Sequence, residues 1–312
     1  MIRHRGLLLV GLAAMAAGLL ALPAGAAAQD AAEAKVALQY VASPEALAAF
    51  TPAKALEGGC PFTMRGDTGS LNVAGTDVKF AIRWSEPQQA FYAGLDLNGN
   101  GFLDGGEWAQ MAQSGMVTFA NVQAGDKKHI VRIANMRTTV RTTGGGGILG
   151  STGGYTIAGF YQGLYQGTPI RIFDDNLDGK ITQDGKDAIQ VGRSGVAIPL
   201  RKFHQIGSQH CSLAAAEDGS SVTITPLAGE PLGIVDSSYK RGLKVLALVD
   251  DQGRSYDLAA SGRTGIPAGK YKLAYGVLAD SSAFTVIKPT DKCPVYEIQA
   301  GNLLSIQLGN KG

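Results

Sequence analysis

Short runs in which hydrophobic and polar residues alternate, separated by turn residues, recur along most of this chain. The clearest of them lie at residues 70–84, 128–141 and 155–173. Strict alternation places the hydrophobic side chains on one face of a half-buried strand. Helical spacing is limited to two short segments, 43–50 and 106–113. The pattern therefore predicts a mainly β protein.

Near residue 200 the pattern changes, and hairpin signals then follow one another at regular spacing towards the C-terminus. About seven short strands between residue 200 and the C-terminus are typical of a β-sandwich. We therefore expect a β-rich domain over residues 29–199 and a C-terminal antiparallel β-sandwich over 200–312. Residues 1–28 differ from both and are expected to be a leader.

The N-terminal segment has the organisation of a secretory signal peptide. Arg3 and Arg5 precede an unbroken apolar run over residues 6–22, and small residues stand at Ala26 and Ala28, where a signal peptidase needs them. We expect cleavage after Ala28, and an uncleaved membrane anchor is the alternative. No later stretch is long and apolar enough to be a transmembrane segment. The mature protein is therefore expected to be secreted or periplasmic.

Charge changes the picture of possible partners. The chain has 28 basic and 26 acidic side chains, and loss of Arg3 and Arg5 with the leader leaves the two signs in balance. A nucleic-acid partner would require a basic surface. We therefore expect no nucleic acid, and a partner of the envelope or the cell exterior that the sequence does not identify. With 45% hydrophobic residues, the chain has enough apolar side chains for a core.

Three cysteines allow one disulfide bond in an exported protein. They are Cys60, Cys211 and Cys293. We favour a bridge between Cys211 and Cys293 because both fall in the expected C-terminal domain, although the sequence does not settle the pairing.

Residues 96–107 (DLNGNGFLDGGE) carry oxygen donors at the spacing of a calcium-binding loop. Calcium takes six to eight oxygen ligands, and a short loop supplies them by curling around the ion. The expected side-chain ligands are Asp96, Asn98, Asn100, Asp104 and Glu107, and Phe102 would contribute its carbonyl oxygen. Gly101, in the sixth position, permits the positive φ that the curl requires. Every position resembles that of an EF-hand loop.

A second stretch, residues 174–187, repeats the first half of this pattern. Its expected ligands are Asp174, Asn176, Asp178, the Lys180 carbonyl oxygen, Thr182 and Asp187. The twelfth position is Gly185, so the closing carboxylate must be displaced, and we prefer Asp187 to Asp184 in that role. Loops with a displaced final acid resemble those of dockerin-like and other extracellular EF-like proteins, in several of which one flank is a strand.

Both stretches follow a strand–turn–strand pattern, which indicates a degenerate internal duplication. The alternative is a pair of metal-free turns, since Asn, Asp and Gly are ordinary turn residues. Two similar loops in similar contexts favour calcium. Extracellular modules bind it with Kd on the order of 10⁻⁴–10⁻³ M, so we expect Ca²⁺ to be a structural ion.

A short motif in the C-terminal half carries a second resemblance. Residues 266–273 (IPAGKYKL) resemble a strand of carboxypeptidase-regulatory-like and transthyretin-like sandwich domains. The resemblance implies a β-sandwich that serves as an accessory or adhesion module. It supplies no catalytic residues that match positions in this chain.

Other candidate chemistry is weaker. Residues 67–70 (DTGS) resemble an aspartic-protease turn, but a second copy is lacking in the sequence, so we expect an ordinary turn before a strand. His204, His210 and Cys211 lack an evident fourth zinc ligand. The glycine-rich stretch 144–154 is expected to be a loop between strands, because it lacks the Lys-Ser/Thr ending of a phosphate-binding loop.

An aromatic group in the middle of the chain leaves sugar stacking as an alternative to a place in the strand core. Its members are Tyr155, Phe160, Tyr161 and Tyr165. We assign no catalytic residue and no cofactor other than Ca²⁺. We therefore expect an exported calcium-binding structural or binding protein without enzymatic activity, and the alternatives are a calcium-stabilised hydrolase and a carbohydrate-binding or adhesion module.

Overall fold

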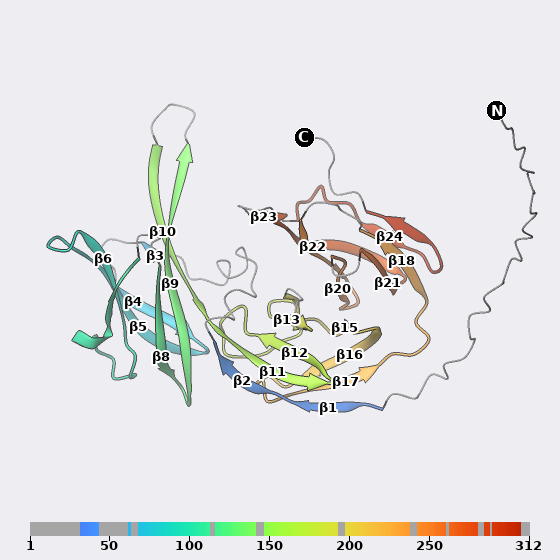
Figure 1. Ribbon diagram of the computed structural model, residues 1–312, viewed down its shortest axis with the longest axis horizontal. Coiled ribbons are helices and arrows are strands. Elements are labelled where there is room, and N and C mark those ends of the chain that lie inside the picture. The colour runs from blue at the N-terminus through green and yellow to red at the C-terminus, as the bar shows by residue number, and fades with distance from the viewer. Residues whose placement is uncertain are drawn as a thin grey trace, which may run out of the picture. The chain divides into compact units, whose positions relative to one another are not determined.

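The computed structural model describes ten segments of the chain. They are residues 32–43, 62–63, 68–112, 116–141, 147–192, 197–237, 242–259, 262–279, 284–287 and 289–306. The expected leader, most of the expected helix at 43–50, and Cys60 lie outside them. β-Strands are almost the only regular secondary structure of the described segments (Figure 1), which confirms the mainly β class.

The first pair of sheets surrounds one hydrophobic core. One sheet has the order β4 (Thr68–Val73), β5 (Thr76–Ser85), β6 (Ala90–Leu95) and β7 (Trp108–Gln110). The other has the order β3 (Phe62–Thr63), β10 (Gly147–Ile157), β9 (Lys127–Arg141) and β8 (Met116–Ala124). Their buried side chains, which include Val73, Val78, Leu95, Val122 and Ile133, form what we call the first core.

A second pair of sheets encloses the second core. One has the order β14 (Ile198–Pro199), β13 (Ala188–Val191), β12 (Thr168–Phe173), β11 (Gly159–Tyr165) and β2 (Gln39–Ala42). The other has the order β1 (Ala34–Ala37), β17 (Ser221–Pro226), β16 (Gln209–Ala215) and β15 (Phe203–Ile206). The second core includes Val36, Ile170, Ile189, Leu213 and Ile224, and it therefore takes side chains from both sides of residue 200.

The C-terminal strands form a β-sandwich around a third core. Its smaller sheet has the order β21 (Arg263–Pro267), β18 (Leu232–Asp236) and β25 (Leu303–Ser305). The larger sheet has the order β20 (Ser255–Asp257), β19 (Leu243–Asp250), β22 (Gly269–Ala279) and β23 (Phe284–Ile287), and β24 (Tyr296–Ile298) also pairs with β22. Val235 and Ile266 of the smaller sheet pack with Leu248 of the larger sheet. The β18–β25 pair is parallel, so the sandwich is not wholly antiparallel.

Two local predictions were wrong because strand pairing overrides local pattern. The segment expected to be helical at 106–113 contains the end of a 3-10 turn, η1 (Gly105–Glu107), followed by β7, which pairs with β6. The glycine-rich segment is a strand from residue 147 onwards, because β10 pairs with β9 along its whole length, as the long hairpin in Figure 1 shows.

The turn expected at residues 67–70 was also wrong within the part that the structure describes. Thr68, Gly69 and Ser70 already belong to β4 and pair with β5. Gly69 lies against the ring of Phe80, where an added Cβ would be 2.8 Å from a ring carbon. The strand therefore continues through these residues because glycine leaves room for the aromatic ring on the neighbouring strand.

The expected Cys211–Cys293 disulfide is not formed. Both cysteines are free thiols. Cys211 is buried in the second core, whereas Cys293 packs against the third. The aromatic group lies in the strands as expected: Tyr155, Phe160, Tyr161 and Tyr165 are all buried. No helix among the described residues has the length and hydropathy of a membrane span.

Candidate calcium loops

The two candidate calcium loops occupy equivalent places in the topology. Residues 96–107, which we call loop 1, connect β6 of the β5–β6 hairpin to a third antiparallel strand, β7. Residues 174–187, which we call loop 2, connect β12 of the β11–β12 hairpin to β13 in the same way. The duplicated sequence pattern thus corresponds to two three-stranded units, each with a loop before its last strand.

Loop 1 curls around the carboxylate of its first residue. Asp96 is 3% exposed, and its Oδ1 accepts hydrogen bonds from the backbone N–H groups of Gly99 and Asn100 at 2.8 and 3.2 Å. Its Oδ2 accepts from the N–H of Gly101 at 2.7 Å. Gly99 and Gly101 have φ values of 76° and 80°, in the left-handed region that glycine adopts readily.

The middle donors of loop 1 follow at alternate residues. Asn98 Oδ1 accepts from the N–H of Asn100 at 2.9 Å, and Asn100 Oδ1 accepts from the N–H of Phe102 at 2.8 Å. Asn100 Nδ2 donates to Asp104 Oδ2 at 3.2 Å. These bonds fold the polar side chains into the curl of the loop, whereas the Phe102 ring is exposed.

Glu107 closes loop 1 from its last position. Its Oε1 accepts from the N–H of Leu97, the second residue of the loop, at 2.8 Å. Its Oε2 accepts from the N–H of Asp104, the ninth residue, at 2.9 Å. The Glu107 N–H donates in return to the Asp104 carbonyl oxygen at 3.0 Å, within η1. The carboxylate is thereby buried and fixed across the mouth of the loop.

Loop 2 repeats the inner hydrogen bonds of loop 1. Asp174 Oδ1 accepts from the N–H of Asp178 at 3.1 Å, and its Oδ2 accepts from the N–H of Gly179 at 2.8 Å. Asn176 Oδ1 accepts from Asp178 at 3.3 Å, and Asp178 Oδ1 accepts from Lys180 at 2.9 Å. The first six residues of the two loops therefore have the same backbone curl.

Asp187 occupies in loop 2 the place that Glu107 has in loop 1. Its Oδ1 accepts from the N–H of Asp175, the second residue, at 3.2 Å, and its Oδ2 accepts from the N–H of Thr182, the ninth, at 2.6 Å. These are the two backbone positions that Glu107 holds in loop 1. The aspartate side chain is one methylene shorter, and two further residues of chain bring it to the same position.

Asp184 has a different partner. Its carboxylate accepts from Thr182 Oγ1 at 3.0 Å and forms an ion pair with Lys186 at 2.8 Å. The hydrogen bond from Lys186 is the main reason that the pKa of Asp184 is lowered to about 2. Asp184 is therefore turned towards solvent and Lys186, away from the closing position.

In loop 2, the negative charges of the buried carboxylates are unfavourable without a nearby positive charge. Burial raises the pKa of Asp174 to about 7, and repulsion from Asp187 and Asp178 adds to the rise, although the N–H of Gly179 lowers it. Burial likewise raises the pKa of Asp187 to about 6. A cation at this position would offset both effects.

The donor chemistry of both loops fits an oxygen-ligated cation. Each loop combines carboxylate, amide or hydroxyl oxygens with a backbone carbonyl, the set that Ca²⁺ accepts. Among the described residues, no group of three or more His, Cys, Asp or Glu side chains is placed as a metal cluster. A cation in either loop would therefore also need amide or carbonyl oxygens, for which Asn98, Asn100, Asn176 and the Phe102 and Lys180 carbonyl groups are the candidates.

The histidines near Cys211 have other roles than zinc binding. His204 is fully buried, and its Nε2 lies 2.9 Å from the backbone N of Arg201, which donates to it. His210 packs edge-on against Tyr256, with ring centroids 5.5 Å apart. Cys211 lies in the second core. Each of the three side chains therefore has a packing or hydrogen-bonding contact within the protein.

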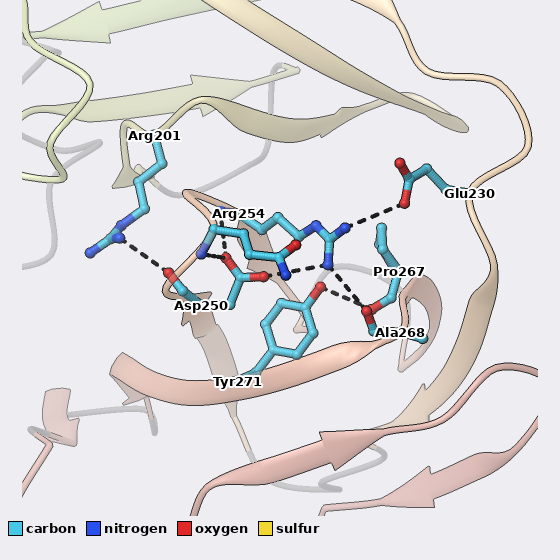
Figure 2. Close-up of polar contacts among 8 residues, drawn as sticks. Arg201, Glu230, Asp250, Arg254, Pro267, Ala268 and Tyr271 are labelled. Atoms are coloured by element: carbon cyan, nitrogen blue, oxygen red, sulfur yellow. Dashed lines mark hydrogen bonds and ion pairs between the residues drawn. The ribbon is translucent and has the colours of Figure 1, made fainter.

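A network of polar contacts around the half-buried Arg254 lies in the C-terminal sandwich (Figure 2). Arg254 lies 3.3 Å from a Glu230 oxygen and 3.5 Å from Asp250 Oδ2, and it donates to the Ala268 carbonyl oxygen at 3.1 Å. Asp250 Oδ1 accepts from the backbone N–H of Arg254 at 2.8 Å. Arg254 thus joins two carboxylates to the PAGKY turn.

This network gives the PAGKY motif a structural role. The Tyr271 hydroxyl donates to the Pro267 carbonyl oxygen at 2.9 Å, next to the Arg254 contact with Ala268. A Cβ on Gly269 would lie 3.3 Å from Arg254 Nη1 and 3.4 Å from the Tyr271 ring. A side chain here would therefore press on the guanidinium and touch the ring, which glycine avoids.

Two residues that contact the loops or belong to them were not predicted from the sequence. Lys79 of β5 donates to the Gly101 carbonyl oxygen at 3.2 Å and lines a pocket of about 400 Å³ beside loop 1. Leu177 of loop 2 is 4% exposed and lies in the first core. Neither belongs to a ligand pattern, so spacing alone does not single them out.

The structure is that of a mainly β protein with a C-terminal sandwich and two loops whose first residues curl in the same way. Comparison of the chain with protein-family models, curated proteins and solved structures finds no match. Its function is therefore inferred from its own residues.

Proposed function

We propose that this is an exported structural or binding protein of the envelope or cell exterior that binds Ca²⁺ in loops 1 and 2 as a structural ion. One observation carries the proposal: Glu107 and Asp187, at different positions in sequence, accept hydrogen bonds from the same two backbone positions of their loops. Simple Asx turns do not require such a distant closing carboxylate.

Calcium would contribute stability through binding to the folded state. At a free concentration about ten times Kd, one site adds roughly 1.4 kcal/mol to the free energy of unfolding. Loops rich in glycine gain most from such an ion because their backbone is intrinsically flexible. A structural role fits affinities on the order of 10⁻⁴–10⁻³ M, which suit an extracellular module.

The hydrolase alternative receives less support from the described side chains. Asp250 and Glu230 are both engaged by Arg254, and both Asp250 oxygens have backbone or guanidinium partners. The sugar-binding alternative also loses its first candidates, because the aromatic group of residues 155–165 is buried. Trp108 is half-buried, and the Arg83 guanidinium lies 3.9 Å from its ring centroid, on one face of the ring.

Calorimetric titration of the chelator-treated mature protein tests the proposal. We expect two sites for Ca²⁺, and we expect Glu107→Gln and Asp187→Asn to remove one site each. Asp184→Asn is the matched control, because Asp184 lies in loop 2 but does not close it. Absence of binding heat together with an unchanged melting temperature would refute the proposal. Loss of a site in Asp184→Asn would refute the assignment of the closing residue.

A further inference from the structure

Leu177 lies in a different core from the strands that flank it. Loop 2 leaves β12 and enters β13, whose Ile172 and Ile189 belong to the second core. Leu177 belongs to the first core, whose other buried members among the described residues lie between positions 71 and 157. It has a φ of 63°, which is disfavoured for a leucine. The contact with the first core therefore holds a backbone conformation that leucine would not adopt readily by itself.

The backbone after Leu177 is seated on a turn of the first core. A Cβ on Gly179 would lie 2.5 Å from the Ala74 carbonyl oxygen, and a Cβ on Gly75 would lie 3.1 Å from the Asp178 carbonyl oxygen. Ala74 and Gly75 form the turn between β4 and β5. Both glycines have a φ of 81°. Glycine at both positions permits this approach, because side chains there would separate the two backbones.

The second half of loop 2 is attached to the second core. Ile181 is 2% exposed within that core, and its N–H donates to the Glu217 carbonyl oxygen at 2.8 Å. Gln183 Nε2 donates to the Leu213 carbonyl oxygen at 2.7 Å. Loop 2 therefore contacts the first core with Leu177 and Gly179 and the second core with Ile181 and Gln183.

Loop 1 makes no equivalent connection through its described contacts. Leu97 packs against the first core, and its carbonyl oxygen accepts from the N–H of Gln123 at 2.9 Å. The loop then leads into β7 of the sheet that it left. Loop 1 thus serves as an internal comparison, with the same ligand pattern attached to one core.

We propose that Ca²⁺ in loop 2 joins the first core to the second, an inference that rests on the proposed calcium binding. The expected ligands Asn176 and Asp178 flank Leu177 directly, so an ion that holds both also holds the leucine backbone between them. Without the ion, Asp174, Asp178 and Asp187 repel one another, and the loop relaxes away from the Ala74–Gly75 turn.

Other contacts between the two cores limit the size of this effect. The Tyr40 hydroxyl lies 2.6 Å from His129 Nδ1, and Lys127 Nζ donates to the Tyr161 hydroxyl at 3.2 Å. His129 and Lys127 belong to β9, whereas Tyr40 and Tyr161 belong to the sheet of the second core. These contacts do not involve the calcium ligands, so loss of calcium is expected to loosen the connection without separating the cores.

Amide hydrogen exchange of the full mature chain, with calcium or with chelator, tests this inference. In the wild type, calcium is expected to slow exchange at least tenfold at Gly75, whose N–H donates to Asn72 Oδ1, and at Ile181. Asp187→Asn should abolish both effects. Glu107→Gln should leave them intact, because it alters loop 1 alone.

Leu177→Ala separates calcium binding in loop 2 from the connection between the first and second cores. It retains all the expected ligands, so two calcium sites should remain by calorimetric titration, but protection at Gly75 should fall by at least tenfold. If this variant does not fold, the comparison of Asp187→Asn with Glu107→Gln decides the matter. Two calcium sites with no calcium-dependent protection at Gly75 would overturn the inference alone. Absence of calcium binding in the wild type would overturn the proposed function as well.

Discussion

The close approach of loop 2 to the Ala74–Gly75 turn makes Gly179→Ala a sensitive test of the packing between the first two cores. Gly179 has a φ of 81°, and the added Cβ would lie 2.5 Å from the Ala74 carbonyl oxygen. Gly101 is the matched control because it occupies the same sixth position in loop 1, with a φ of 80° and no atom within 4 Å of an added Cβ.

The two variants separate the backbone effect from the contact. An alanine in the left-handed region is disfavoured by roughly 1–2 kcal/mol, which applies to both positions. Overpacking at Gly179 adds roughly 1–3 kcal/mol because backbone atoms, not flexible side-chain ends, must move. We therefore expect Gly101→Ala to lower the free energy of unfolding by about 1–2 kcal/mol and Gly179→Ala to lower it by about 2–5 kcal/mol.

Urea denaturation in chelator measures these differences without a contribution from calcium. Equal m-values for the two variants would show that the comparison concerns stability and not the extent of unfolding. The effects of substitutions at independent sites agree only to within about 0.5 kcal/mol. If the losses of unfolding free energy in the two variants differ by less than this amount, the close contact between Gly179 and Ala74 is refuted.

Two further predictions concern buried charges. Arg254→Met is expected to destabilise the protein by about 3–5 kcal/mol in urea denaturation, because it leaves the buried Asp250 carboxylate without its guanidinium partner. Arg263→Met removes the ion pair between the exposed Arg263 and Asp236 and should cost less than about 1 kcal/mol. Equal effects of the two substitutions would contradict the reasoning. Burial lowers the pKa of His204 to about 4, so the folded state binds fewer protons than the unfolded state between about pH 6.5 and 4. Stability should fall as the pH decreases through this window, by at most about 3 kcal/mol from this group. His204→Gln should remove that part of the pH dependence, and an unchanged slope would count against it.

Local pattern predicted the strands well where one face is buried and the other exposed. In β4 and β5, buried residues such as Leu71, Val73 and Val78 alternate with exposed ones, as the sequence implies. Prediction failed at the segments where pairing with a distant strand decided the conformation. Residues 108–110 form a strand because β6 is available to pair with them, and Gly147–Gly154 extend as a strand because β9 lies alongside.

The candidate loops were also predicted in part from the sequence. The spacing of Asp96, Asn98 and Asn100 implies a curled loop because alternate side chains point inward, and this feature is local. The relation of Asp187 to Asp175 and Thr182 is less local, since it depends on how the chain returns through Gly185. Residue spacing made Asp187 a candidate, but hydrogen-bond geometry distinguishes it from Asp184.

The sequence by itself determined the mainly β class and the order of oxygen donors in each loop, because both depend on residues close together along the chain. Tertiary structure decided which core each loop contacts. Leu177 lies in the first core and Ile181 in the second, although the two residues are only four positions apart in sequence and similar in chemistry. A hydrophobic side chain has no intrinsic preference for one core over another, so its partner depends on which surface the folded backbone brings within reach.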